Sequence, residues 1–232
     1  MSERDLKDSE IYRSRIKGWD WELLGFLLLL CVAFFAFFKT RATLANYGCA
    51  WVEQNSMNRT LDDGDALLMR LAGTGKQAQR GDVIIVNVQG YEECGNIDYL
   101  IKRLIATGGD KVRCQDGQVE IWKAEGDGWE VLNEPYAYYG ENDEYKTHYD
   151  FGIYEVGEGE IFFLGDNRSG ALSSVDSRYE EQFGSHLQDS LYKESDIYGI
   201  VSQNTIEYKG FWTGYFTVMR SIEEFFKSCF GI

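Results

Sequence analysis

The sequence predicts a mainly β fold: an antiparallel β-sheet domain with an inserted β subdomain, preceded by one N-terminal transmembrane helix. Short runs rich in Val, Ile and Leu follow residue 60, and Gly, Asn or Asp bounds most of them, which is typical of antiparallel strands. A single proline against 25 glycines indicates that turns depend on Gly, Asn and Asp. One uncharged apolar run precedes all the strand signals and is typical of a membrane-spanning helix.

That apolar run extends from Leu23 to Phe38. At ~1.5 Å per residue, it is slightly short of a ~30 Å hydrocarbon core. Trp19 and Trp21 before it and Lys39 after it can lengthen the span by lying at the membrane interface. We therefore expect a transmembrane signal anchor over residues 21–40.

Basic residues give the anchor an expected orientation. Five of them precede the run: Arg4, Lys7, Arg13, Arg15 and Lys17. The positive-inside rule then places residues 1–20 in the cytoplasm and the remainder of the chain outside it. A cleavable signal peptide is the main alternative, because Thr43-Leu44-Ala45 is an acceptable cleavage site. We favour the uncleaved anchor, since the run is longer than the usual ~7–15 residues; a buried core helix is the least favoured interpretation.

Five segments carry strand signals in the exterior part of the chain. They are 66–69, 83–88, 112–122 with a hairpin signal at Asp116-Gly117, 160–164 and 197–201. The acidic, tyrosine-rich segment 123–155 separates the strongest motifs, so we expect an inserted subdomain over about 115–155. Residues 211–232 carry Phe and Trp at roughly helical spacing. This amphipathic segment either lies on the membrane or packs on the β core.

Charge and cysteine content exclude some classes of function. The net charge of −15 argues against a nucleic-acid partner and against electrostatic attraction to anionic lipid. The five cysteines are too dispersed for a disulfide-rich scaffold. Cys94 and Cys114 either pair or serve as small hydrophobic residues. No Cys/His spacing indicates a metal site, and we expect no cofactor.

Ser56 and Lys102 are the main candidates for chemistry. A serine hydroxyl is a weak nucleophile unless a base accepts its proton. Neither histidine, His148 or His186, lies in a motif suited to that task. Lys102 lies among apolar neighbours, and burial can lower a lysine pKa until the amine is neutral. The residues themselves thus suggest a Ser/Lys dyad.

Four ordered segments resemble bacterial type I signal peptidases, the membrane-anchored Ser/Lys endopeptidases that remove signal peptides from exported proteins. They are Ser56-Met57-Asn58-Arg59-Thr60-Leu61, Gly81-Asp82-Val83-Ile84-Ile85-Val86, residues 99–112 from Tyr99-Leu100-Ile101-Lys102-Arg103 onwards, and Gly165-Asp166-Asn167-Arg168 followed by Ser174-Val175-Asp176-Ser177-Arg178. Each segment is weak alone, but their order behind an anchor is specific. The resemblance implies an extracytoplasmic Ser/Lys peptidase domain over 41–210.

The resemblance also implies roles for individual residues. Ser56 would be the nucleophile and Lys102 its general base. Ser174 would orient the lysine, with Ser173 as a close rival. The Ser56 N–H and Gln54 would stabilise the oxyanion. A structural, ion-paired motif would comprise Asp166, Asn167, Arg168, Asp176 and Arg178.

The implied substrates are precursor proteins that carry a small-x-small segment beyond their apolar helix. An extended peptide could pair with a strand edge while shallow pockets receive alternate side chains. We expect the pocket to be lined by Trp51, Val52, Met57, Leu100 and Ile101. The expected partners are signal-peptide-bearing precursors and the lipid bilayer. We expect the chain to be a single-pass protein of the cell membrane.

Two departures from the family pattern keep other functions open. Gln54 replaces a serine, and Arg59 replaces the proline of Ser-Met-x-Pro-Thr-Leu. A catalytically silent, membrane-tethered β module that binds peptides is one alternative. A processing peptidase for pilin or conjugation proteins is another and would use the same dyad. A self-cleaving Ser/Lys regulator is disfavoured because it would be cytoplasmic and lack the anchor.

Overall fold

The computed structural model describes residues 21–36, 38–39, 42, 45–75, 77–91, 94–123, 127–146, 149–169, 176–178 and 192–230. The chain divides into two compact units, of which the first ends at Asn46 and the second begins at Tyr47. In the first unit, residues 21–36 are helical and solvent-exposed. None of the helices in the described ranges combines the length and apolarity needed to cross a membrane.

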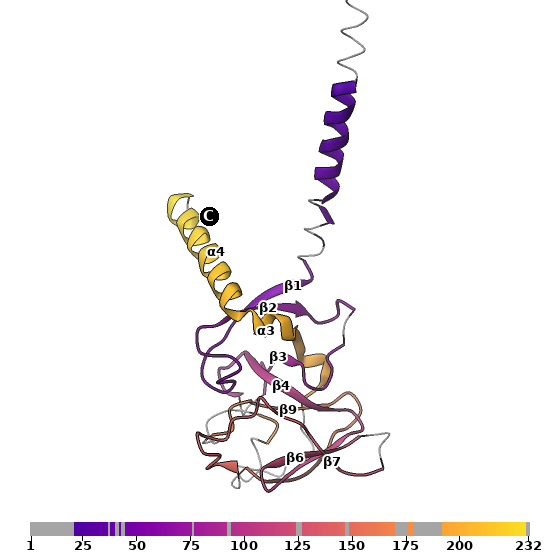
Figure 1. Ribbon diagram of the computed structural model, residues 1–232, viewed down its shortest axis with the longest axis vertical. Helices are drawn as coiled ribbons and strands as arrows, with labels where there is room; N and C mark the ends of the chain where they lie inside the picture. Colours follow the sequence, from indigo (N-terminus) through magenta and orange to yellow (C-terminus); the bar gives the residue numbers. More distant parts are fainter. Residues whose placement is uncertain are drawn as a thin grey trace, which may run out of the picture. The chain divides into compact units, whose positions relative to one another are not determined.

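The second unit contains a six-stranded sheet with the order β1-β2-β10-β3-β4-β9 (Figure 1). Every neighbouring pair in this sheet is antiparallel, which confirms the predicted mainly antiparallel β fold. The strands are β1 Tyr47–Trp51, β2 Ala66–Leu71, β3 Val83–Asn87, β4 Tyr99–Thr107, β9 Ile161–Leu164 and β10 Ile197–Val201.

The chain between β4 and β9 forms a second, four-stranded antiparallel sheet with the order β7-β6-β5-β8. Its strands are β5 Lys111–Gln115, β6 Gln118–Trp122, β7 Glu130–Val131 and β8 Phe151–Glu155. Asp116 and Gly117 both have positive φ, at 50° and 68°, as the tight turn of a two-residue hairpin requires. The hairpin predicted at Asp116-Gly117 is therefore confirmed.

Alternating side chains divide the core into three clusters. In β3, Ile84 packs in one cluster and Ile85 in another, because successive strand residues point to opposite faces. β9 connects the two sheets in the same way: Phe162 packs with the four-stranded sheet, whereas Phe163 packs with the six-stranded sheet. Cys94 and Cys114 lie in different clusters and are thiols in this structure.

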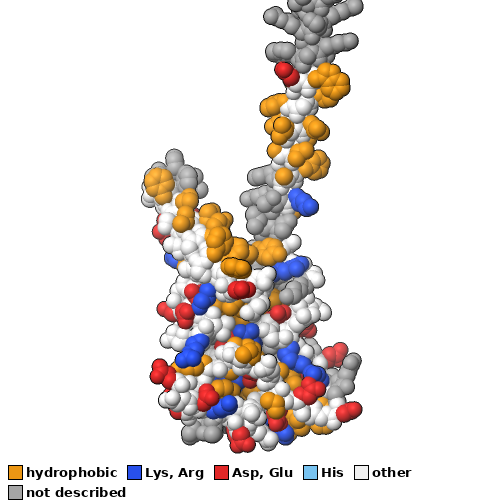
Figure 2. Space-filling model, in the orientation of Figure 1, with side chains coloured by type: hydrophobic (Ala, Val, Ile, Leu, Met, Phe, Trp, Pro, Cys, Tyr) orange, Lys and Arg blue, Asp and Glu red, His pale blue; other side chains and the backbone are white. Residues whose placement is uncertain are grey.

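Two helices end the described chain: α3 Gln203–Glu207 and α4 Lys209–Phe230. The first turns of α4 lie on β2, where the Ala66 N–H donates to Thr213 Oγ1 over 2.9 Å. α4 then extends away from the sheet (Figure 1) with large apolar side chains on its surface (Figure 2). These exposed side chains are Phe211, Tyr215, Val218, Met219, Ile222 and Phe225. The middle of α4 also contacts the sheet, because the guanidinium carbon of Arg220 lies 5.6 Å from the centroid of the Trp51 ring in β1.

Candidate active site

Ser56 begins a tight turn that follows β1. The Met57 carbonyl accepts hydrogen bonds from the N–H groups of Thr60 and Leu61, at 3.1 and 2.8 Å. The side chains of Met57 and Leu61 are buried and fix the turn to the core, whereas Ser56 remains partly exposed. The turn thus holds a reachable hydroxyl on a rigid base.

The segment after β9 holds the Ser56 backbone from the other side. The Asn167 N–H donates to the Ser56 carbonyl over 3.0 Å, and Asn167 Nδ2 donates to the Asn55 carbonyl over 2.9 Å. A Cβ at position 165 would lie 2.5 Å from the Ser56 carbonyl oxygen, so only glycine permits this approach. Gly165 and Asn167 therefore fix the nucleophile candidate against the end of β9.

Lys102 lies in β4 with only 2% of its surface exposed. Burial lowers the pKa of Lys102 to about 8, and the opposing attraction of Asp176 and Asp166 only partly offsets the effect. A substantial fraction of this amine is therefore neutral at mildly alkaline pH. A neutral buried lysine is suited to accept a proton.

The two candidates approach the same loop from different elements. Arg103, the neighbour of Lys102, is paired with Leu164, and the next residue, Gly165, touches the Ser56 carbonyl. Within the described part of the chain, the Ser56 hydroxyl and the Lys102 amine have no side-chain hydrogen-bond partner. Ser173, Ser174 and both histidines lie outside the described residues.

Buried ion pairs surround Lys102. Arg103 donates to Asp166 through Nε at 2.9 Å and Nη2 at 2.5 Å, and Thr60 Oγ1 donates to the same carboxylate at 2.6 Å. Asp176 pairs with Arg178 at 2.8 Å. Of the residues grouped as an ion-paired motif, Asp176 and Arg178 pair with each other, whereas the described partner of Asp166 is Arg103, which lies outside that group.

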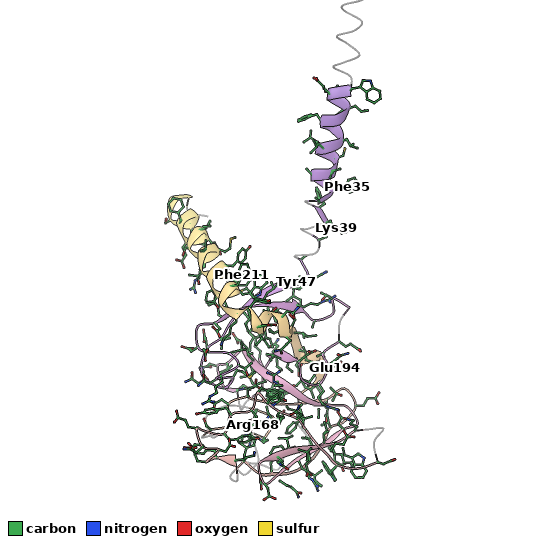
Figure 3. The ribbon with its side chains drawn as sticks, viewed as in Figure 1. Phe35, Lys39, Tyr47, Arg168, Glu194 and Phe211 are labelled. Atoms are coloured by element: carbon green, nitrogen blue, oxygen red, sulfur yellow. The ribbon has the colours of Figure 1, made fainter. Side chains whose placement is uncertain are left out.

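Arg168, labelled in Figure 3, is fully buried and pairs with Glu134 from the segment between β7 and β8. Burial alone would lower the pKa of Arg168, but hydrogen bonds and charge attraction from Glu134 raise it well above its ordinary value. Arg168 also donates to Tyr139 Oη at 2.6 Å. Sequence reasoning missed Glu134, because nothing near it along the chain marks a partner 34 residues away.

Aromatic rings cover several of these guanidinium groups. Arg103 stacks on Tyr136 at 3.9 Å and Arg178 on Tyr149 at 3.8 Å, measured from the guanidinium carbon to the ring centroid. The sequence analysis noted the tyrosine-rich segment but gave it no role at the site. Its composition was the available signal, since stacked aromatic rings commonly accompany buried or partly buried arginines.

A cleft of about 600 Å³ runs past Ser56. Of the predicted pocket residues, Trp51, Val52, Met57 and Ile101 line it. Neither Leu100 nor Lys102 lines it. Leu100 packs on the face of β4 opposite Ile101, because adjacent strand residues cannot share a face, and Lys102 follows Leu100 by two residues. Further lining residues are Cys49, Ala50, Glu53, Met69, Ile85, Asn96, Ile97, Asp98, Tyr99 and Tyr198.

Gln54, the candidate second oxyanion donor, lines the same cleft as Ser56. It is exposed and has a positive φ of 72°. Its N–H donates to Asp63 Oδ1 over 2.9 Å, which anchors the backbone. Gln54 therefore lies at the wall of the cleft, two residues before Ser56.

Comparison with known proteins places this geometry in a family. The family model described as "Signal peptidase, peptidase S26" matches residues 21–206. Signal peptidase I T of Bacillus subtilis is 35% identical over 132 residues, which cover 55% of this chain and 61% of that protein. Signal peptidase I of Bacillus licheniformis is 36% identical over 131 residues, covering 53% and 63%. The chain thus spans about three fifths of the length of these curated relatives.

A crystal structure of a signal peptidase I from Enterococcus faecalis is 27% identical, with a TM-score of 0.39, and the match covers 55% of this chain and 98% of that one. The family match extends from the N-terminal helix to α3 and includes Ser56, Lys102 and the segment after β9. The chain belongs to the signal peptidase, peptidase S26 family.

Proposed function

We propose that the chain is a signal peptidase I: a serine endopeptidase that cleaves signal peptides from exported precursors after a small-x-small motif. The observation that carries the proposal is the buried Lys102, whose pKa burial lowers to about 8, in a domain of the peptidase S26 family. Burying an amine costs free energy, and lysines whose pKa is lowered in this way are concentrated at functional sites.

In the proposed reaction, the Ser56 hydroxyl attacks the scissile carbonyl while neutral Lys102 takes its proton. The Ser56 N–H and the Gln54 amide donate to the oxyanion. Lys102 then gives the proton to the leaving amine, and an ester joins Ser56 to the signal peptide. Lys102 then takes a proton from water, whose oxygen attacks the ester carbonyl, and Lys102 returns this proton to the Ser56 oxygen as the signal peptide leaves. Ser174 is the proposed orienting hydroxyl for the lysine.

The cleft supports a preference for small side chains. An extended peptide would lie between residues 49–52 and the start of β4, with backbone hydrogen bonds to an exposed edge. Val52, Met57 and Ile101 would meet the alternate side chains, and these large apolar residues leave shallow space for them. Small residues would fit there, and bulky ones would be excluded sterically.

Membrane attachment is part of the proposal. Residues 21–40 would anchor the chain with its N-terminus in the cytoplasm and its peptidase domain outside. The apolar face of α4, which includes Phe211, Ile222 and Phe225, would add contact with the bilayer. Replacing Ile222 and Phe225 by Ser should reduce co-flotation of the 45–232 fragment with phosphatidylcholine vesicles. Unchanged flotation would remove α4 from the proposal.

Cleavage of a model precursor with an Ala-x-Ala site tests the activity. The full chain in detergent micelles should cut this precursor, and Ser56→Ala and Lys102→Ala should each abolish cleavage. Activity equal to wild type in both variants would refute the dyad. The same full chain should gain activity as the pH rises through about 8, since only the neutral amine of Lys102 is a base.

The peptide-binding module remains the second candidate because Gln54 and Arg59 depart from the family pattern. A folded wild-type chain that binds the precursor but never cuts it would favour this candidate. A pilin or conjugation peptidase would instead cut its own precursors with the same dyad. A panel of precursors therefore separates the two peptidases.

A further inference from the structure

We propose that Arg59 is a positioning residue that fixes the Ser56 turn by stacking on Tyr138. Only the predicted effect on kcat rests on the proposed function, because the contact between Arg59 and Tyr138 can be tested without measuring activity. Arg59 occupies the position where the family pattern has proline, so the chain must hold this turn by other means.

The backbone at Arg59 is in the left-handed region, with φ of 75°. Residues other than glycine adopt this conformation only where their surroundings enforce it. The Asn58 side chain contributes, since its Oδ1 accepts the Arg59 N–H at 3.0 Å. Proline cannot adopt this φ, because its ring holds φ near −65°. The turn in this chain is therefore incompatible with the family residue.

The Arg59 side chain provides the second constraint. Its guanidinium carbon lies 3.9 Å from the centroid of the Tyr138 ring. This stack gives the otherwise exposed Arg59 side chain a fixed neighbour. A guanidinium group at this distance over an aromatic face is attracted by the ring quadrupole.

Tyr138 is itself tied to the segment that holds Ser56. Its N–H donates to the Asp166 carbonyl at 2.8 Å, and its carbonyl accepts the Arg168 N–H at 2.7 Å. Asn167, between these two residues, donates to the Ser56 carbonyl at 3.0 Å. These contacts form a closed circuit that runs from Ser56 through Asn167 and Tyr138 to Arg59 and back along the turn.

This closed circuit of contacts has a kinetic consequence. Small displacements of a nucleophile, on the order of 1 Å, can lower the rate about a hundredfold. Loss of the contact between Arg59 and Tyr138 would let the turn relax from the strained φ at Arg59 and move the Ser56 hydroxyl and N–H. The lost orientation should lower kcat and leave KM nearly unchanged, because the cleft lining does not include Arg59 or Tyr138.

The test uses the full chain in detergent micelles with the variants Arg59→Gln, Tyr138→Leu and the double variant. Each single variant should lower kcat for the model precursor about tenfold, with KM within about twofold, and the double variant should be no worse. Arg59→Lys and Tyr138→Phe keep a cation over a ring and should recover most of the activity. Additive losses, or a change in KM alone, would overturn the proposal and indicate a direct substrate contact.

Arg113→Gln is the control, because Arg113 of β5 also stacks on an aromatic ring, that of Trp129 at 4.1 Å, and it pairs with Glu120 as well. This variant should leave kcat unchanged. Hydrogen exchange measured by mass spectrometry supplies a readout independent of catalysis: protection of residues 56–61 should fall in Arg59→Gln and Tyr138→Leu but not in Arg113→Gln. Unchanged protection would refute the proposed role of the Arg59–Tyr138 stack. A wild type that cuts no precursor would refute only the proposed activity.

Discussion

Two ion pairs, one beside the six-stranded sheet and one on the four-stranded sheet, lie in opposite environments. Beside the six-stranded sheet, Arg103 and Asp166 form an ion pair whose side chains are 5% and 0% exposed. On the four-stranded sheet, Lys111 and Glu155 form a pair whose side chains are 43% and 67% exposed. A buried charge requires a partner or must become neutral, whereas an exposed charge is already solvated by water. Of these two pairs, only Arg103–Asp166 constrains the fold and the site.

The largest effect on stability should come from removing one member of a buried pair. Asp166→Ala would leave Arg103 buried without its carboxylate partner, which should lower the free energy of unfolding by about 3–5 kcal/mol. Urea unfolding of the 45–232 fragment measures this loss. Glu155→Ala, which removes an exposed carboxylate, is the matched control. Equal losses in the two variants would contradict the distinction between the sheets.

Removing the charge of Lys102 should have the opposite effect and increase the free energy of unfolding. Its pKa falls from an ordinary 10.5 to about 8 on folding, so the unfolded chain binds more protons between these values. Stability should therefore rise as pH increases from about 8 to 10.5, and the full penalty of about 3 kcal/mol is present below pH 8. Lys102→Met should raise the free energy of unfolding at pH 7 by roughly this amount and abolish cleavage.

The pH series gives the control for this prediction. Above pH 10.5, the lysine is neutral in both states, so the advantage of Lys102→Met should largely disappear. An advantage that does not depend on pH would mean that packing, rather than charge, causes the gain.

A smaller loss should follow removal of the hydroxyl that donates to Asp166. Thr60→Val keeps the shape of the side chain but deletes the 2.6 Å hydrogen bond to this carboxylate, so we expect a loss of about 1–3 kcal/mol. Thr217→Val is the comparison, because Thr217 donates to a helix carbonyl on an exposed part of α4. Thermal unfolding should separate the two variants, and equal midpoints would argue against a special role for Asp166.

The smallest effect on stability should come from an exposed ion pair of the four-stranded sheet. Glu130→Ala breaks the exposed pair with Lys123, and the expected loss is about 0–1 kcal/mol. The loss should also fall as salt is added, because exposed charges are screened. A loss above 2 kcal/mol, or one that salt does not change, would show that this sheet also depends on its charges.

The sequence by itself determined the local features of this protein. Strands β2, β3, β5, β6, β9 and β10 and the Asp116-Gly117 hairpin follow from local residue patterns and turn chemistry, whereas β1, β4, β7 and β8 were not among the five segments with strand signals. Ser56 and Lys102 were identified because each lies in a short segment of recognisable pattern. Alternation also explains the one misplaced residue of the cleft: Ile101 and Leu100 are both apolar, and the sequence does not indicate which of the two faces the cleft.

Only the tertiary structure decided which distant residues meet. The sheet inserts β10 between β2 and β3, an order that no local pattern specifies. Asp166 meets Arg103 across 63 residues, and Arg59 reaches Tyr138 in a segment that sequence analysis treated separately. The physical reason is that propensity and periodicity act over a few neighbouring residues. Charge pairs and ring stacks depend on how the sheets and loops are packed together.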